Sequence, residues 1–201
     1  MTVVVDTSGR IRAVALELFA AHGYEQTSLR EIADQVGITK ASLYYHYPSK
    51  QSLLTALVDP LVEDSRAVVD EAEKLQPTPD NVRAILARQL DTILREQALC
   101  GLLVRDAVAM IAVLAPRWEE MLGLQSRMYA WLAGPGASPS TCVRAMAALE
   151  TLGVPLKAAG QLPAIDDDEL RSTLLDAALA VLGLTELDGA TDGRAPDDET
   201  V

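Results

Sequence analysis

Apolar side chains recur at helical spacing along most of the chain, and between Thr27 and Lys50 they mark two short segments separated by a glycine. In the first segment they fall three and four residues apart, on one face of a helix, at Leu29, Ile32, Ala33 and Val36. Thr27 or Ser28 is the expected N-cap, and Glu31, three residues after Ser28, completes the pattern of a capping box. Gly37 is expected to end this helix, because glycine adopts the left-handed conformation of a helix end without steric cost.

The second segment follows Thr39, its expected N-cap, and has Leu43 as its only strongly apolar residue before a run of aromatic side chains. Little of this helix can therefore be buried. The side chains that it exposes can contact phosphates or base edges: Lys40, Ser42, Tyr44, Tyr45 and His46. A helix of this size fits the major groove of B-DNA. The pattern predicts a helix-turn-helix whose second helix reads DNA, although Tyr47, and Tyr44 with it, also fit a core position.

From about Ile11 to Leu57 the chain resembles the amino-terminal domain of the TetR-type transcriptional regulators. The resemblance covers about a quarter of the chain and rests on the ordered signature LF, HGY, TS, IA, GI, K, LY, HY, SK and LL. It implies operator contacts from Ser28, Arg30, Lys40, Ala41, Ser42, Tyr44, Tyr45 and His46, with Lys50 on the DNA backbone. It also implies a homodimer on a pseudo-palindromic double-stranded DNA operator, and a small-molecule effector that releases it. Whether the protein represses or activates depends on where the operator lies relative to a promoter.

The rest of the chain has helical periodicity and no alternating strand pattern, which predicts an all-α protein. We expect residues 1–58 to form the helix-turn-helix domain and residues 59–185 a larger helical domain for effector binding and dimerisation. Residues 186–201 are acidic and lack periodicity, which is typical of a disordered tail.

Proline and helix-capping residues suggest where individual helices begin and end. A first helix over residues 10–22 is expected to cover the helix-turn-helix. A long helix begins after Ser49, and Pro60 is expected to interrupt it, because proline removes a backbone hydrogen bond. The sequence QPTPDN is typical of a linker, with Asp80 or Asn81 capping the next helix.

Three later helices have distinctive compositions. Residues 100–115 are apolar on nearly all sides, which predicts burial on nearly all sides, with Arg105 and Asp106 as the only charges. These charges either pair structurally, or Arg105 faces an acidic effector. The helices expected at about 140–159 and 167–182 are rich in small residues and, by analogy with the family, form a four-helix dimer interface.

Amides within apolar stripes, and a concentration of aromatic and methionine side chains, suit a pocket for an apolar small molecule. The candidate effector contacts are Gln89, Gln97, Arg105, Met110, Trp118, Met121, Met128 and Trp131. Each of these stripes is also compatible with ordinary core packing, and the amides with satisfied core groups.

The net charge of −12 is unusual for a DNA-binding protein, because phosphate neutralisation calls for Lys and Arg. The charge is unevenly distributed. Residues 1–58 contain five basic and five acidic side chains, whereas the remaining 143 residues contain twelve basic and twenty-four acidic ones. The DNA-binding part is thus neutral, which predicts weak nonspecific affinity and a shallow salt dependence.

Enzymatic chemistry has little support in the sequence. There are two widely separated histidines, no glycine-rich phosphate loop and no serine in a nucleophile elbow, so we expect no catalytic site, metal or cofactor. Two alternatives remain: a catalytic cluster formed only in space, and a helical small-molecule-binding dimer that has lost its DNA function. The intact polar side chains of the predicted reading helix weigh against the second.

No signal peptide or membrane span is expected, since the first ten residues lack a positive start and no apolar run reaches eighteen residues. We therefore expect a cytoplasmic protein without membrane association. Cys100 and Cys142 lie far apart in apolar settings and are expected to be buried, reduced thiols.

Overall fold

Helices make up nearly all of the described part of the chain, and no strand occurs within it. The computed structural model describes residues 6–154 and 165–184. The helices are α1 (Thr7–His22), α2 (Leu29–Val36), α3 (Lys40–His46), α4 (Lys50–Ala72), α5 (Pro79–Arg95), α6 (Gln97–Arg105), α7 (Ala107–Val113), α8 (Ala115–Ala133), α9 (Pro139–Thr151) and α11 (Asp167–Leu182). The all-α class expected from the sequence is confirmed. The expected tail over residues 186–201 lies outside the described residues.

The ends of α2 and α3 are set by the residues that the sequence indicated. The Ser28 side chain accepts a hydrogen bond of 3.1 Å from the backbone N–H of Glu31, and Thr39 caps α3 in the same way. Gly37 has φ +78°, the left-handed conformation that favours glycine. The Glu31 carboxylate lies 3.4 Å from Nδ1 of His22, so this side chain links α2 to the end of α1.

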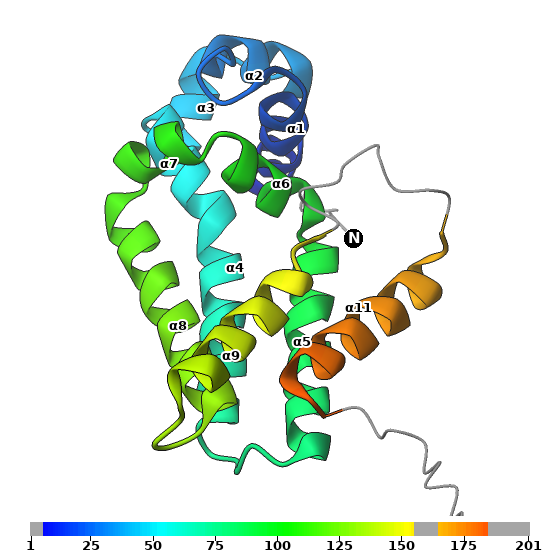
Figure 1. Cartoon of the computed structure of the whole chain (residues 1–201). Coiled ribbons are helices and arrows are strands. Elements are labelled where there is room, and N and C mark those ends of the chain that lie inside the picture. Colours follow the sequence, from blue (N-terminus) through cyan, green and yellow to red (C-terminus); the bar gives the residue numbers. More distant parts are fainter. Residues whose placement is uncertain (1–5, 155–164, 185–201) are drawn as a thin grey trace, which may run out of the picture.

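α1, α2 and α3 pack around a small shared core at one end of the molecule (Figure 1). Its fully buried side chains come from all three helices: Ile11, Ala15, Phe19, Ile32 and Leu43. Burying an aliphatic or aromatic side chain of this kind contributes about 1.5–3 kcal/mol. Tyr47 is also buried, and its hydroxyl lies 2.6 Å from the Ser8 hydroxyl, so Tyr47 is a core residue.

α4 is a continuous helix that joins this bundle to the rest of the protein (Figure 1). The interruption expected at Pro60 is wrong: the proline lies inside the helix, at an exposed position. Proline there removes a single backbone hydrogen bond, which costs less than the packing of this long helix contributes. The expected domain boundary between residues 58 and 59 therefore falls within α4.

The larger part of the molecule is built on α4, α5 and α8, which run lengthwise in Figure 1, with α9 and α11 lying across their lower half. α9 packs on α11 and on α8, and α8 packs on α4. The helix expected over residues 167–182 is present. The one expected over residues 140–159 is shorter than expected, because α9 ends at Thr151, and residues 155–159 lie outside the described residues.

The expectations of a single buried helix over residues 100–115 and of a cap at Asp80 or Asn81 are wrong. The segment 100–115 is not one buried helix: it breaks at Asp106 into α6 and α7, and Val108 is 89% exposed. A run of apolar residues does not by itself tell a buried helix from a helix at an open edge. Thr78, not Asp80 or Asn81, caps α5, because Pro79 occupies the first helical position, where its missing N–H is harmless.

The two cysteines differ in environment. Cys100 is buried, and burial raises the pKa of its thiol to about 11. Cys142 is exposed on the outer face of α9, so the expected burial of this residue is wrong in the protomer. Its apolar neighbours Val143 and Met146 are exposed beside it.

Candidate functional site

α3 exposes large side chains that do not pack in the core. Tyr45 is 86% exposed and Tyr44 is 41% exposed. The Lys40 ammonium lies 5.5 Å from the centre of the Tyr44 ring, and the Tyr45 and His46 rings meet edge to face with centroids 5.6 Å apart. These side chains form one outward face of cationic, aromatic and hydrogen-bonding groups.

A few contacts fix the core-facing side of α3 against the neighbouring helices. Leu43 is its one buried side chain, and Tyr47 follows the helix directly with its hydroxyl against Ser8 of α1. Arg10 of α1 donates a 2.9 Å hydrogen bond to the carbonyl of Val36 at the end of α2. A short helix with so few buried groups thus keeps a fixed orientation through its neighbours.

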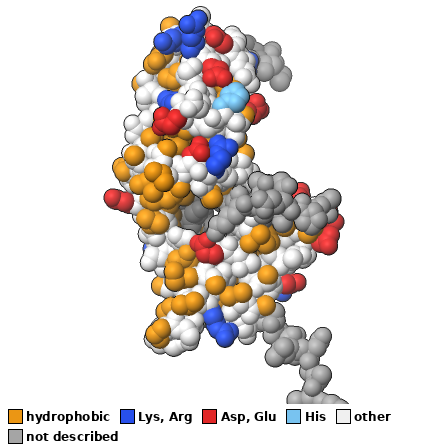
Figure 2. Space-filling model, turned by 45° about the horizontal axis from the view of Figure 1, so that its top comes forward, with side chains coloured by type: hydrophobic (Ala, Val, Ile, Leu, Met, Phe, Trp, Pro, Cys, Tyr) orange, Lys and Arg blue, Asp and Glu red, His pale blue; other side chains and the backbone are white. Residues whose placement is uncertain are grey.

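Ser28 and Arg30, at the start of α2, are exposed, and the Arg30 Nε lies 3.9 Å from a carboxylate oxygen of Asp34. Ala41 is exposed and Ser42 is half-buried in the first turn of α3. Basic and acidic side chains are mixed over this end of the molecule in the view of Figure 2, in line with the neutral charge of residues 1–58.

Lys50 occupies a different environment from Lys40. Its ammonium donates hydrogen bonds to the backbone carbonyls of Tyr24, Glu25 and Thr27, at 2.8, 3.2 and 3.1 Å. It also lies 4.4 Å from the centre of the Tyr24 ring. All three donors of the ammonium are thus used within the loop between α1 and α2. The expected contact of Lys50 with the DNA backbone stays a prediction, and the structure gives this side chain a role in holding the loop.

A cavity of about 440 Å³ lies in the larger part of the protein, within the range typical of small-molecule sites. It is bounded by residues of α4, α5, α6, α7, α8 and α9 and is lined mainly by apolar side chains. Four of the candidates named from the sequence line it: Gln89, Trp118, Met121 and Met128.

The other four candidates do not line this cavity. Gln97 is exposed, and Met110 is fully buried in the core. Trp131 donates its ring N–H to the carbonyl of Leu75, at 2.9 Å. Arg105 is turned toward α1. Residue type and spacing made these residues candidates for a ligand site. Which side of each helix faces the cavity, however, depends on packing between segments that are distant in the sequence.

Some lining residues were not anticipated, notably Leu61, Ser65 and Val69 of α4 and Glu150 of α9. Ser65 could have been identified from the sequence, because it lies between Leu61 and Val69 at four-residue spacing and so interrupts an apolar helix face. Gln89 interrupts the apolar face of α5 in the same way. Glu150 could not have been identified in this way, since an acidic residue on an alanine-rich helix is typical of a solvated position.

The junction of α6 and α7 connects the wall of the cavity to the helix-turn-helix. Leu103, Val104 and Ala107 line the cavity. Between them, Arg105 donates to the carbonyls of Ala20 and Phe19 at the end of α1, at 2.7 and 3.0 Å.

Asp106 completes this junction by accepting a 3.3 Å hydrogen bond from the backbone N–H of Tyr24. The adjacent Arg105 guanidinium, and then this backbone bond, lower the pKa of the Asp106 carboxyl. Of the two readings of Arg105, the structure shows the structural pairing. We call Arg105 and Asp106 the α1 clamp.

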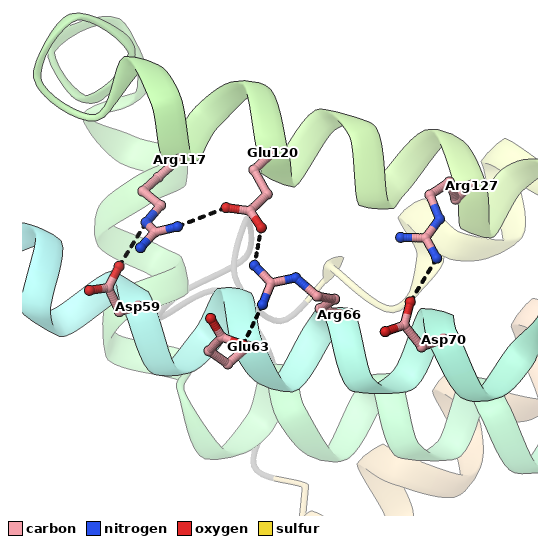
Figure 3. Close-up of polar contacts among 7 residues, drawn as sticks. All are labelled: Asp59, Glu63, Arg66, Asp70, Arg117, Glu120 and Arg127. Atoms are coloured by element: carbon pink, nitrogen blue, oxygen red, sulfur yellow. Dashed lines mark hydrogen bonds and ion pairs between the residues drawn. The ribbon is translucent and has the colours of Figure 1, made fainter.

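Away from the cavity, α4 and α8 are joined by a row of ion pairs (Figure 3). Glu120 lies at its centre and accepts from Arg66 and from Arg117, the latter at 2.9 Å. Arg117 also pairs with Asp59 at 2.8 Å. The Arg66 hydrogen bond, and then that of Arg117, lower the pKa of Glu120. Further along the row Arg127 pairs with Asp70, also of α4, at 2.7 Å.

Within residues 6–154 and 165–184, no helix is both long and apolar enough to cross a membrane. In the same part of the chain no group of three or more His, Cys, Asp or Glu side chains is placed to hold a metal ion.

Comparison with known proteins identifies the amino-terminal part. Residues 11–57 match the family model described as bacterial regulatory proteins of the tetR family. The chain is 31% identical over 80 residues to the HTH-type transcriptional regulator EthR of Mycolicibacterium smegmatis, across 40% of this chain and 36% of that protein. It is 37% identical over 65 residues to the HTH-type transcriptional repressor KstR2 of Rhodococcus jostii, across 29% of this chain and 32% of that protein. The chain thus spans about a third of the length of these relatives.

The likeness to solved structures extends much further along the chain. The crystal structure of Mycobacterium smegmatis AmtR superposes with a TM-score of 0.75 over 91% of this chain and 88% of that one, at 22% identity. At this identity the superposition shows that the fold is shared, including the helices beyond residue 57.

Proposed function

We propose, from the premise that residues 11–57 form a TetR-family DNA-binding domain, that this protein is a homodimeric cytoplasmic repressor released from its operator by a small molecule. In this proposal residues 1–58 bind DNA, and residues 59–185 bind the effector and dimerise. The protein performs no catalysis. One of its curated relatives is itself named a repressor.

The observation that carries the proposal is the outward face of α3. A seven-residue helix with one buried side chain leaves Lys40, Tyr44 and Tyr45 directed away from the core. A lysine contacts phosphates, or bases through their acceptor groups, and tyrosines supply apolar contacts and hydroxyl hydrogen bonds. Ser28, Arg30, Ala41, Ser42 and His46 are proposed to complete the contact surface.

Two copies are proposed to associate through the outer faces of α9 and α11. Val143 is 63% exposed and Met146 46% exposed on α9, and the exposed alanines Ala177 and Ala180 lie on α11. Small and apolar side chains allow helices to approach closely across a twofold axis. The two α3 helices would then enter successive major grooves, with half-site centres about 34–36 Å apart or slightly more.

Effector binding is proposed to act through the α1 clamp. The effector would contact Leu103, Val104 and Ala107, which immediately flank Arg105 and Asp106. A shift of this junction would move the end of α1, on which α2 packs. The effector changes operator affinity only as far as it binds the released shape more tightly than the DNA-bound shape.

The decisive experiment compares Tyr44→Ala with Tyr44→Phe. We expect Tyr44→Ala to abolish specific operator binding, measured by a mobility shift against operator and scrambled duplexes. The melting temperature and the dimer should be nearly unchanged, because this side chain is 41% exposed. Tyr44→Phe keeps the ring and tests the hydroxyl separately. A Tyr44→Ala protein that binds operator normally would contradict the assignment of α3.

The clamp is tested by Arg105→Gln, which removes the charge and part of the donor fork. We expect this variant to bind operator but to respond weakly to any ligand that releases the wild type. The measurement is the ratio of operator affinities with and without that ligand. An unchanged ratio would exclude the α1 clamp from the coupling.

A further inference from the structure

The side chains that line the cavity of about 440 Å³ restrict the chemical class of its ligand. None of the described lining residues is Lys, Arg or His. Most are apolar, and Val69, Leu103 and Met128 among them are buried, on α4, α6 and α8. An anionic group would therefore enter the cavity without a basic partner from these walls, and the desolvation of its charge would be little compensated.

The thiol of Cys100, which belongs to the α6 wall, is uncharged as well. Burial, with the charge of Glu96 as the next cause, raises the pKa of this thiol to about 11, so it is protonated at neutral pH. The burial that disfavours the thiolate would disfavour any other ion placed against the same wall.

Glu150 is the only carboxylate among the described lining residues, and it lies at an exposed position on α9. It is already engaged: the Gln125 side-chain amide, at 3.0 Å, and the Tyr129 hydroxyl, at 3.2 Å, are among its partners. The lining residues Val104 and Leu122 are also exposed and apolar. Glu150 therefore gives no reason to expect a cationic ligand.

α4 directs its charged and uncharged polar side chains to different surroundings. Arg66 pairs with Glu63 and Glu120 in the row of ion pairs between α4 and α8 (Figure 3). The adjacent Ser65 is half-buried and lines the cavity. α4 thus contributes one hydroxyl group and otherwise apolar side chains to the cavity.

Gln89 of α5 supplies the side-chain amide of the opposing wall. It is half-buried, and its amide can donate two hydrogen bonds. Within residues 6–154 and 165–184, no hydrogen bond joins the side chain of Gln89 or of Ser65 to another residue. Because α4 packs on α5, these two uncharged donors lie on neighbouring walls. A few polar groups in an otherwise apolar cavity are typical of the groups that orient a ligand.

We propose that the cavity binds an uncharged lipophilic molecule whose carbonyl group accepts a hydrogen bond from the Gln89 amide, with its apolar body among the side chains of α4, α6 and α8. The Ser65 hydroxyl is a second donor available to that carbonyl. The proposal rests on the proposed function in taking this cavity as the effector site.

The test uses four probes that share one phenylalkyl body: methyl phenylhexanoate, phenylhexanoate, phenylhexylamine and hexylbenzene. Affinities are measured by isothermal titration calorimetry. The chain has two tryptophans, so a Trp131→Phe variant reports by fluorescence whether a probe reaches Trp118 in the cavity. We expect the ester to bind at least about tenfold more tightly than either ion, which corresponds to about 1.4 kcal/mol.

The role of Gln89 is tested by Gln89→Leu, which keeps the size of the side chain and removes its donors. This variant should bind the ester about fivefold more weakly, as expected for one lost hydrogen bond, and should bind hexylbenzene at least as tightly as the wild type does. Gln97→Leu is the matched control, because Gln97 is exposed and does not line the cavity. It should leave all four affinities unchanged.

Each other outcome overturns part of the inference. An ion that binds as tightly as the ester overturns the uncharged class, and failure of all four probes to bind overturns the cavity as a site for such ligands. In Gln89→Leu, an unchanged ester affinity, or an equal loss for the ester and hexylbenzene, overturns the role of Gln89.

These titrations contain no DNA, so their failure is distinguishable from failure of the proposed function. Operator binding by the same protein preparation shows whether the regulator assignment stands. Binding of the ester without release of operator supports the ligand class and contradicts the effector part of the proposed function.

Discussion

The two lysines at either end of the α3 region lie in different environments, and the roles that we propose for them can be measured separately. Lys50 donates to three carbonyls of the loop between α1 and α2, whereas Lys40 lies on the exposed first turn of α3. Replacing each by methionine keeps most of the side-chain length and removes only the charge and the donors. Lys50→Met is therefore expected to act on stability, and Lys40→Met on DNA binding.

The magnitude follows from the contacts. A hydrogen bond to a charged group contributes about 1.5–3 kcal/mol when well buried. The Lys50 side chain is half-buried, and its three acceptors can partly be rehydrated, so we expect a total loss of about 2 kcal/mol. For a chain of this size, about 2 kcal/mol corresponds to a fall in melting temperature of roughly 4–8 °C.

Lys40→Met should leave stability within about 0.5 kcal/mol of the wild type, as surface substitutions usually do. If each Lys40 in the dimer neutralises one phosphate, the slope of log affinity against log salt should become shallower by about 0.9 per protomer. The assays are differential scanning calorimetry and operator titrations at several salt concentrations. A Lys50→Met protein with an unchanged melting temperature and a shallower salt slope would refute the assignment of Lys50 to the loop.

Three further predictions use the same preparations. The wild-type dimer should show a salt slope of about −5, for on the order of six phosphate contacts, and a slope twice as steep would contradict the neutral interface. Arg66 and Arg117 lower the pKa of Glu120 from 4.5, so its stabilisation should be complete above that value and be lost as the pH falls through the lower folded-state pKa. Glu120→Gln should remove this part of the acid-induced fall in melting temperature, and an identical fall in both proteins would exclude the ion pairs as its cause. Cys142 should react with a thiol reagent at neutral pH in the protomer and become protected on dimerisation, while Cys100 stays unreactive; full reactivity of Cys142 in the dimer would argue against α9 as the interface.

The helix-turn-helix was the part of the fold most accessible from sequence, and the reason is that its signals are local. Ser28, Gly37 and Thr39 act on residues within one helical turn, so spacing alone places the ends of α2 and α3. The burial of Leu43 and the exposure of Tyr45 likewise follow from the periodicity of a single short helix. The local patterns were enough to predict both the elements and the side chains that α3 exposes.

The wall of the cavity was accessible only in part, because it depends on which helices meet. Gln89, Trp118, Met121 and Met128 were indicated by residue type, but Met110 and Trp131 belong to the same types and lie elsewhere. An apolar stripe shows that a helix face is covered without showing whether another side chain or a cavity covers it.

The α1 clamp illustrates why coupling between the two parts could not be resolved from spacing. Arg105 could pair within its own neighbourhood or face a ligand, and its true partners are carbonyls of Phe19 and Ala20, more than eighty residues earlier. Backbone carbonyls at a helix end have no signature in residue type, so no sequence pattern identifies them as the acceptors of a distant guanidinium. The same long-range contact places the only charges of an otherwise apolar segment between the cavity and α1. In the proposed function, operator release would therefore depend on Arg105 and Asp106. The sequence around these two residues does not reveal that role.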